Sequence, residues 1–333
     1  MTQKNGKSCC AEFKTMIGGQ ALIEGILMRG PQKDAIAVRG TEGIHLEVMP
    51  RKLNPPKSAK SWPFIRGVFN FFDAQVMGVK MLLKSADLAP EEYSEEPSKF
   101  DRWLEKKLGN EKFQQAVLYI AVAMGLGLSI GLFFLLPMVV GGFFDRWIES
   151  TLLLNLVEGV IRMVIFLAYM LLVSRMGEMK RVFSYHGAEH KTIRCYERGL
   201  PLTVENARNQ TRLHPRCGTS FLLVVMVISI LVFSIASSAL LAVFPGLEAI
   251  RGSFGYRLLM IGFKLLLLPL VVSITYEINR WAGRHDNGFT RILTAPGLWM
   301  QHFTTNEPDD GMLEVAIAAM TAVLPEEEGS DQW

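Results

Sequence analysis

The sequence has few of the features that mark secreted, disordered or nucleic-acid-binding proteins. Its 333 residues include only 4 cysteines, which excludes a small scaffold held together by disulfides. Lys and Arg number 35 against 32 Asp and Glu, and the net charge of +3 is too small to indicate a nucleic-acid partner. The 20 Phe and 17 Met residues exclude a chain without a folded core. A secretory signal peptide is not predicted, because the first fifteen residues are polar.

Long apolar runs are present instead, at 114–136, 152–173, 219–244 and 256–277. Each has the ~20 residues that a helix needs to cross a ~30 Å hydrocarbon core. Within the third run, Leu222–Phe244 contains no charged residue, whereas a surface helix of a soluble protein would carry a charged stripe. Core helices of a large soluble enzyme are therefore the less favoured alternative. We predict a mainly α, polytopic membrane protein with a four-helix transmembrane bundle, surrounded by the lipid bilayer.

The basic residues predict the orientation of these spans. The segment 175–218, between the second and third spans, carries nine Lys and Arg, whereas the loops 145–151 and 245–255 carry one each. Because basic loops stay on the cytoplasmic side, we expect the segment 175–218 in the cytoplasm. With four crossings, both termini then lie in the cytoplasm as well, as expected for a multi-pass protein of the cell membrane. The cytoplasm would also keep the cysteines reduced.

The chain before the spans predicts a small β-containing cytoplasmic unit. A flexible N-terminus over 1–15 precedes this unit, which covers 16–60 and includes a hairpin that turns at Gly40–Gly43. An interfacial helix and a charged connector follow over 61–112. The helix, at 64–88, could lie along the membrane surface or insert into the membrane, and its scattered charges favour the surface.

The later segments are the four-span bundle, a cytoplasmic C-terminal segment and a disordered acidic tail, at 113–278, 279–324 and 325–333. Within the C-terminal segment, Trp281–Thr305 is predicted to be irregular. Met312–Leu324 has the pattern of a short amphipathic helix, with Asp310 as its N-cap.

The strongest chemical signal is His186-Gly-Ala-Glu189-His190, directly after the second span. Histidines four residues apart share one face of a helix, so both imidazoles can bind the same ion. This H-x-x-E-H pattern is the inverted form of the zinc-peptidase motif, in which the Glu takes a proton from water. We predict a divalent metal bound by His186 and His190, with Glu189 as general base. Zinc is the first expectation, with Fe, Mn and Co left open, and ordinary hydrogen-bonded histidines are the alternative.

Three residues are candidates for the third metal ligand. His214 and Cys217 lie where the chain returns to the membrane before the third span, and Glu277 lies at the cytoplasmic end of the fourth. We rank His214 first, Glu277 second and Cys217 third. Glu197 shares the helix face of the two histidines but lies ~10 Å further along the axis, too far for direct ligation unless the helix breaks.

A glycine-rich stretch over 18–30 contains Glu24 and Arg29. It is not a Walker loop, because the Gly-Lys-Ser/Thr sequence is absent. Close glycines allow a tight backbone approach. The stretch therefore predicts either a contact to substrate or metal, or a structural strand-turn in which Glu24 pairs with Arg29.

Three charged residues lie inside the predicted spans: Glu158 and Arg162 in the second and Lys264 in the fourth. At ~1.5 Å per residue they lie about 9–15 Å from the outer ends of their spans. Because these depths match, we predict that Glu158 faces Lys264 or Arg162. One acid and two bases at this depth favour a pair that locks the bundle over a transport path.

Several blocks of this sequence resemble the YqhQ-like family of bacterial membrane proteins: Gly18–Ala21, Glu24–Gly25, Met28–Arg29, Tyr185–Thr192, Leu202–Asn206, Arg212–Gly218, Pro296–Trp299, Glu307–Asp310 and Glu314–Ile317. The resemblance covers about residues 16–324. It implies a metal-dependent enzyme of the bacterial inner membrane, whose substrate is unknown.

Motif and topology together favour a membrane-embedded metal-dependent hydrolase that acts at the cytoplasmic face. A non-catalytic assembly or regulatory protein, with a structural metal or none, is the alternative. A transporter ranks third, because no pair of interrupted spans is repeated. The sequence identifies no substrate, and it leaves a homo-oligomer open.

Overall fold

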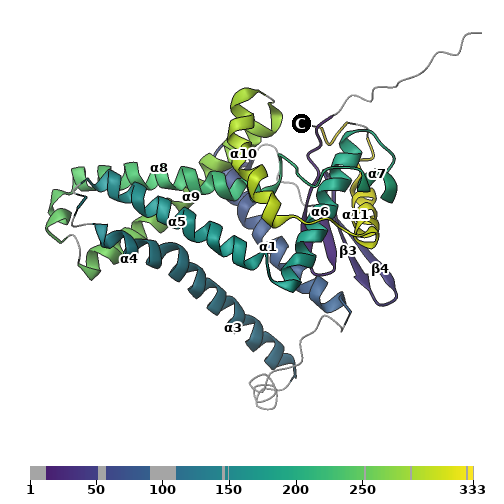
Figure 1. Ribbon diagram of the computed structural model, residues 1–333, viewed down its shortest axis with the longest axis horizontal. Helices are drawn as coiled ribbons and strands as arrows, with labels where there is room; N and C mark the ends of the chain where they lie inside the picture. Colours follow the sequence, from purple (N-terminus) through teal and green to yellow (C-terminus); the bar gives the residue numbers. More distant parts are fainter. Residues whose placement is uncertain are drawn as a thin grey trace, which may run out of the picture. The chain divides into compact units, whose positions relative to one another are not determined.

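The structure is a computed structural model, and it describes residues 13–51, 58–90, 110–144, 147–148, 150–250, 253–285, 287–327 and 329–332. In chain order the elements are β1 (Gly18–Leu22), β2 (Gly25–Arg29), β3 (Lys33–Gly40), β4 (Gly43–Pro50), η1 (Ala59–Ser61), α1 (Ile65–Leu88), α3 (Asn110–Ile130), η3 (Gly131–Leu135), α4 (Leu136–Gly142), α5 (Thr151–Val173), α6 (Gly177–Glu197), α7 (Val204–Arg208), α8 (Gly218–Val243), η5 (Pro245–Ile250), α9 (Phe254–Arg284), α10 (Gly288–Thr304) and α11 (Asp310–Val323). The predicted fold class is confirmed: the protein is mainly helical, with a small sheet near the N-terminus and helices suited to cross a membrane (Figure 1).

Some predicted features lie outside the described residues. They are most of the flexible N-terminus, part of the connector before α1, most of the charged connector before α3, and the single basic residues of the two short loops. The residues concerned are 1–12, 52–57, 91–109, Arg146 and Arg251.

The chain folds as two compact units. The first combines three stretches of sequence, Met1–Pro90, Leu171–Val225 and Val272–Trp333. The second combines Glu91–Met170 with Met226–Val271. The first unit therefore contains the sheet, α1, α6, α7, α10 and α11, and the second contains most of the long apolar helices.

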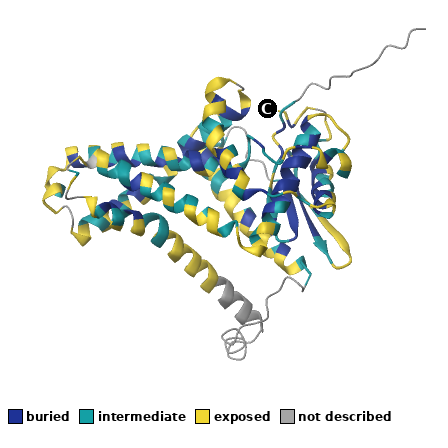
Figure 2. Ribbon diagram, viewed as in Figure 1, coloured by how far each residue is buried: buried dark blue, intermediate teal, exposed yellow. Residues whose placement is uncertain are grey.

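The sheet of the first unit is an antiparallel meander in the order β1-β2-β3-β4, and the predicted hairpin is formed by β3 and β4. Side chains alternate between its faces. Ile26 and Met28 of β2 belong to a buried cluster with α6 and α11, whereas Leu27 packs with Met81 of α1 on the other face. Helices thus cover both faces of the sheet, and buried residues concentrate in the sheet, α6 and α11 (Figures 1 and 2).

The C-terminal segment is more ordered than predicted. Trp281–Thr305 is not irregular, because α9 continues to Arg284 and α10 follows as a regular helix. A capping box starts α10: Asn287 accepts a hydrogen bond from the Thr290 amide, and Thr290 accepts one from the Asn287 amide.

The predicted cap and tail of this segment also need correction. Asp309, not Asp310, caps α11, because its Oδ1 accepts a hydrogen bond from the Met312 amide at 2.8 Å. The tail is not disordered where it is described. Asp331 is buried and accepts a hydrogen bond from the Thr15 hydroxyl, while Thr15 forms a β-bridge with Gln332.

Four helices among the described residues are long and apolar enough to cross a membrane: Ile120–Gly142, Leu152–Val173, Gly218–Val243 and Phe254–Arg284. The first lies six residues later than predicted. It continues from α3 through the π-helical stretch η3 into α4. Pro137 does not end the helix, because it lies in the first turn of α4, where its missing amide hydrogen is tolerated.

The charged residues of the second unit form a pair inside the bundle. Lys264 Nζ of α9 donates to Glu158 Oε2 of α5 at 2.8 Å, and both side chains are 11% exposed. The pairing predicted from matched depth is therefore present. Arg162 instead donates its Nε–H to the Phe133 carbonyl at 2.8 Å, where the π-helical stretch alters the backbone pattern.

Candidate metal centre

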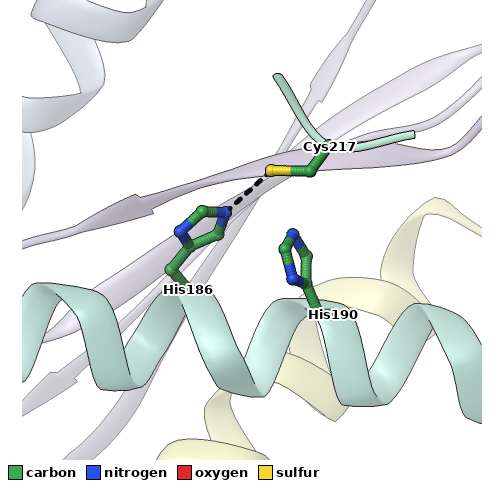
Figure 3. A group of neighbouring side chains, drawn as sticks. All are labelled: His186, His190 and Cys217. Carbon is green, nitrogen blue, oxygen red and sulfur yellow. Dashed lines mark hydrogen bonds between the residues drawn. The ribbon is translucent and has the colours of Figure 1, made fainter. Parts of the chain in front are cut away.

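Helix α6 places both histidines of the H-x-x-E-H motif on one buried face. His190 is 1% exposed and His186 is 9% exposed. Their ring centroids lie 4.4 Å apart at a steep angle, so the rings stand side by side along the helix (Figure 3). The spacing of four residues therefore produces the shared face expected of it.

The third member of the group is Cys217, from the loop that precedes α8. Its Sγ lies 3.1 Å from His186 Nε2, and it faces both rings (Figure 3). One nitrogen of each histidine and this sulfur all lie within 4.8 Å of one another. The arrangement could hold one metal ion with three protein ligands.

The opposite nitrogens of both rings face backbone carbonyl oxygens. Nδ1 of His186 lies 2.8 Å from the Thr304 oxygen, and Nδ1 of His190 lies 2.6 Å from the Arg212 oxygen. A carbonyl only accepts, so each Nδ1 carries the hydrogen and donates. In the metal-binding form of a histidine, Nδ1 donates in this way and Nε2 offers its lone pair to the ion. His190 Nε2 is buried and has no hydrogen-bond partner among the described residues.

Gly187 explains how the Thr304 carbonyl reaches the helix. A Cβ at this position would clash with the Asn306 carbonyl oxygen, so only glycine lets the chain after α10 lie directly on α6. The amide of Asn306 also donates to the Phe183 carbonyl of α6 at 2.9 Å. Gly187, inside the motif, therefore allows the close approach that brings the Thr304 carbonyl to His186 Nδ1.

Gly187→Ala is expected to lower the free energy of unfolding by about 1–3 kcal/mol, the usual cost of overpacking a close contact. The matched control is Gly177→Ala at the start of the same helix, where a Cβ meets nothing within 4 Å. This control should be neutral or slightly stabilising, because alanine favours helix over glycine. Thermal unfolding of both variants in detergent provides the measurement. Equal unfolding midpoints for the two variants would contradict the assigned role of Gly187.

Glu189 is buried beside the histidines, and one of its oxygens is held by the first strand. Its Oε1 accepts a hydrogen bond from the Gly19 amide at 2.9 Å. Burial raises the pKa of Glu189 above its usual value, although the neighbouring His186 and His190 oppose this effect. The carboxyl group is therefore poised to hold or accept a proton nearer neutral pH than an exposed glutamate would.

The histidine–cysteine contact changes the pKa of both groups. Burial alone would raise the pKa of Cys217, but the charges of His186 and His190, together with the hydrogen bond from His186, lower it well below its usual value. Burial likewise opposes the charged form of His186, yet the Cys217 thiolate and Glu189 raise its pKa to about 9. The metal-free group is thus a thiolate beside an imidazolium.

A buried glutamine fixes the loop that carries Cys217. Gln301 of α10 accepts from the His214 amide and donates to the His214 carbonyl, both at 2.8 Å. Arg212 of the same loop donates to the Thr305 carbonyl. Sequence reasoning missed Gln301 and Thr304. Their backbone-directed contacts leave no spacing pattern in the sequence.

Of the three candidates for the third ligand, the structure brings Cys217 to the two histidines and gives His214 and Glu277 other partners. His214, ranked first, does not join the group, because its Nε2 lies 3.2 Å from Glu197 Oε2. Glu197 is also held by Arg216 and by the Thr15 amide. Glu277, ranked second, pairs with Arg66 at the start of α1. Cys217, ranked third, is the residue that meets the histidines, because the turn before α8 folds back over α6.

The glycine-rich stretch has a different role from the predicted ion pair. Glu24, in the left-handed region at φ 48° between β1 and β2, binds Arg181 of α6 through both oxygens. Arg29 lies at the other end of β2 and pairs with Asp34 and Asp73. Glu24 and Arg29 are therefore not partners, because the whole length of β2 separates them. Glu24 instead fixes the β1–β2 turn to the helix that carries the motif.

Fold and site together define a multi-pass membrane protein with a three-residue group suited to a metal ion. The family model described as "Protein of unknown function (DUF1385)" matches residues 62–326. The chain is also 32% identical over 322 residues to "Uncharacterized protein YqhQ" of Bacillus subtilis (strain 168), covering 95% of this chain and 94% of that protein. The chain therefore belongs to the DUF1385 family and is YqhQ-like. No solved structure matches it significantly.

Proposed function

We propose that this chain is a metal-dependent hydrolase embedded in the bacterial inner membrane. In this proposal His186, His190 and Cys217 bind a divalent cation, and Glu189 is the general base. The observation that carries the proposal is the pair of Nδ1–H···O=C hydrogen bonds, which turn both Nε2 atoms toward the Cys217 sulfur. Hydrogen bonds of this kind commonly orient metal-binding histidines.

The chemistry of the donor atoms favours zinc. Two imidazoles and a thiolate form a borderline-soft set, which suits zinc better than magnesium or calcium. The buried, unpartnered Nε2 of His190 would gain a partner when a cation binds. The low pKa of Cys217 favours the same outcome, since the thiolate is the form that binds metals.

Three protein ligands are typical of a catalytic zinc site, because a fourth position stays open to water or substrate. Zinc bound there would act as a Lewis acid on the substrate. Glu189 would take the proton of the attacking water. The Gly19 amide holds Oε1 and leaves Oε2 for this transfer. The raised pKa of Glu189 matches the role, since a general base works best when its pKa approaches the ambient pH.

We also infer that the site lies at the cytoplasmic face of the membrane and that both termini are cytoplasmic. The basic segment between α5 and α8 supports this orientation through the positive-inside tendency. The same segment contains α6 and the loop before α8, so the orientation places the candidate ligands at the inner surface.

The Cys217–His186 contact favours a second candidate function. A thiolate 3.1 Å from an imidazolium is the arrangement of a cysteine nucleophile, and it needs no metal. His186 would then activate Cys217, with the Thr304 carbonyl orienting the ring. The two candidates differ in the role of His190. It is a ligand in the metal-dependent hydrolase, whereas in the cysteine hydrolase it only helps to lower the pKa of Cys217.

Glu189→Gln tests the metal-dependent hydrolase most directly. The variant should fold and bind zinc like the wild type, but lose activity by about 100-fold or more, the usual contribution of a general base. Complementation of a deletion strain measures function, and elemental analysis of the purified variant measures metal content. Glu178→Gln, an exposed substitution in the first turn of the same helix, is the matched control and should complement fully.

Full complementation by Glu189→Gln would exclude the carboxylate from catalysis. If that variant also bound zinc normally, the result would favour the non-catalytic assembly or regulatory role, with zinc as a structural ion.

A further inference from the structure

A cavity of the first unit opens beside the candidate metal centre. This cleft has a volume of about 680 Å³, within the range of small-molecule sites. Its walls come from α1, the last turns of α6, the loop before α8, the end of α9, and α10. Cys217 belongs both to the cleft wall and to the metal-suited group. A ligand in the cleft would therefore reach the group from the Cys217 side.

The cleft is strongly basic. Its lining includes five cationic side chains: Lys14, Arg194, Arg216, Arg280 and Arg291. The lining contains one carboxylate, Glu197, which already binds Arg216 and His214. The lining residues therefore carry more positive than negative formal charge. Such a surface favours an anionic ligand.

Two arginines of the lining each contain one buried hydrogen-bond donor of interest. Nε of Arg216 and Nε of Arg280 are buried and have no hydrogen-bond partner among the described residues. A buried donor without a partner is unfavourable, and an oxyanion is the partner that a guanidinium fork fits best. The two donors belong to lining residues from different elements, Arg216 in the loop before α8 and Arg280 in α9.

The lining also has an apolar part, and some of it lies at the end of a membrane-crossing helix. Phe71 of α1 and Phe221 of α8 face each other with ring centroids 6.5 Å apart, and Leu298 of α10 also lines the cleft. Phe221 lies in the first turn of one membrane-crossing helix, and Arg280 lies near the end of another. Aromatic and aliphatic side chains at that level match a hydrocarbon chain better than a soluble metabolite.

We propose that this cleft binds an anionic lipid, with a phosphate-type headgroup at Arg216 and Arg280 and the start of its apolar chain against Phe71 and Phe221. The inference rests on the proposed hydrolase, because it names the substrate class of that same site. Free phosphate shares the headgroup chemistry but makes no use of the apolar wall. Lipid and free phosphate are therefore separate arms of the test.

The test measures binding of dioctanoyl phosphatidic acid to the full-length protein in detergent, with dioctanoyl phosphatidylcholine and inorganic phosphate as the other probes. Wild type should bind phosphatidic acid at least ~10-fold more tightly than either. Arg280→Gln should weaken that binding by about 10-fold or more, as expected for loss of a charged hydrogen bond. Arg257→Gln, the same substitution near the opposite end of α9 and outside the cleft lining, is the control and should bind like wild type.

Phe221→Ala is a second variant that tests the apolar wall of the cleft without removing a charge. It should weaken binding of phosphatidic acid while leaving that of inorganic phosphate unchanged. Equal affinity of wild type and Arg280→Gln, with equal thermal midpoints, would overturn the proposal. Inorganic phosphate that binds as tightly as the lipid would also overturn it.

His186→Ala separates this proposal from the metal centre. The variant should lose zinc but keep its affinity for phosphatidic acid, because His186 does not line the cleft. Lipid binding without zinc in the wild type would refute the metal-dependent hydrolase and still support the lipid site. Zinc binding without lipid selectivity would refute the lipid site alone.

Discussion

His190→Ala is expected to bind zinc more than about 100-fold more weakly than the wild type, which should hold about one zinc ion per chain. The expected loss exceeds the ~10–100-fold caused by removing a hydrogen-bond partner of a ligand, because a ligand itself is lost. Nε2 of His190 is buried and unpartnered among the described residues, so no other contact competes for it. Elemental analysis gives the stoichiometry, and competition with a chromophoric chelator gives the affinity.

His302→Ala is the matched control for this measurement. His302 is exposed on α10 and outside the group, so its removal should leave zinc binding unchanged. Equal zinc content in the wild type and in a variant lacking both His186 and His190 would refute the proposed metal centre.

That outcome would favour the cysteine hydrolase, which makes its own prediction. In the metal-free protein, iodoacetamide should alkylate Cys217 readily at pH 6, because its pKa is held well below the usual value. Cys195 provides an internal comparison in the same sample. Burial raises its pKa, so it should stay unmodified. Peptide mass spectrometry distinguishes the two thiols.

Reversal of one charge in the Glu158–Lys264 pair is expected to destabilise the second unit by more than about 3 kcal/mol. The two side chains are 11% exposed, and removing one partner of a buried pair leaves an uncompensated charge. The double variant Glu158→Lys with Lys264→Glu should recover most of the loss. The free energy of unfolding in detergent micelles measures all three variants.

The pair Lys33–Glu326 supplies the control, with a similar N–O distance of 2.7 Å on an exposed surface. Its reversal should change stability by no more than about 1 kcal/mol, since solvent screens exposed pairs. A double reversal at Glu158 and Lys264 that is no more stable than either single one would refute the pairing.

Features that follow from local sequence pattern could be predicted. Continuous apolar runs show the membrane-crossing helices, because length and composition suffice to identify them. Histidines four residues apart on a helix share a face by geometry alone, and matched depths indicated the partner of Glu158. The β3–β4 hairpin likewise follows from two alternating runs joined by a glycine-bounded turn.

Features that depend on contacts between distant segments could not be predicted. Cys217 ranked below His214 and Glu277, because the fold of the loop depends on Gln301, which lies more than 80 residues further along the chain. The helix α10 is not apparent from the sequence, because Pro296 and Gly297 interrupt its helical pattern. Glu24 and Arg29 have opposite charges, but the length of β2 gives each a different partner.

The contact between Thr304 and His186 also has a consequence for the order in which the protein is made. The last of the three candidate ligands, Cys217, leaves the ribosome more than 80 residues before Gln301 and Thr304, with the last two membrane-crossing helices in between. At typical synthesis rates this interval lasts roughly 4–17 s. Until it ends, the His186 ring lacks the carbonyl that orients it, and the cysteine loop lacks the amide that holds it. The candidate metal centre is therefore completed only after all four membrane-crossing helices have been synthesised, so cation capture by the finished site follows membrane insertion in time.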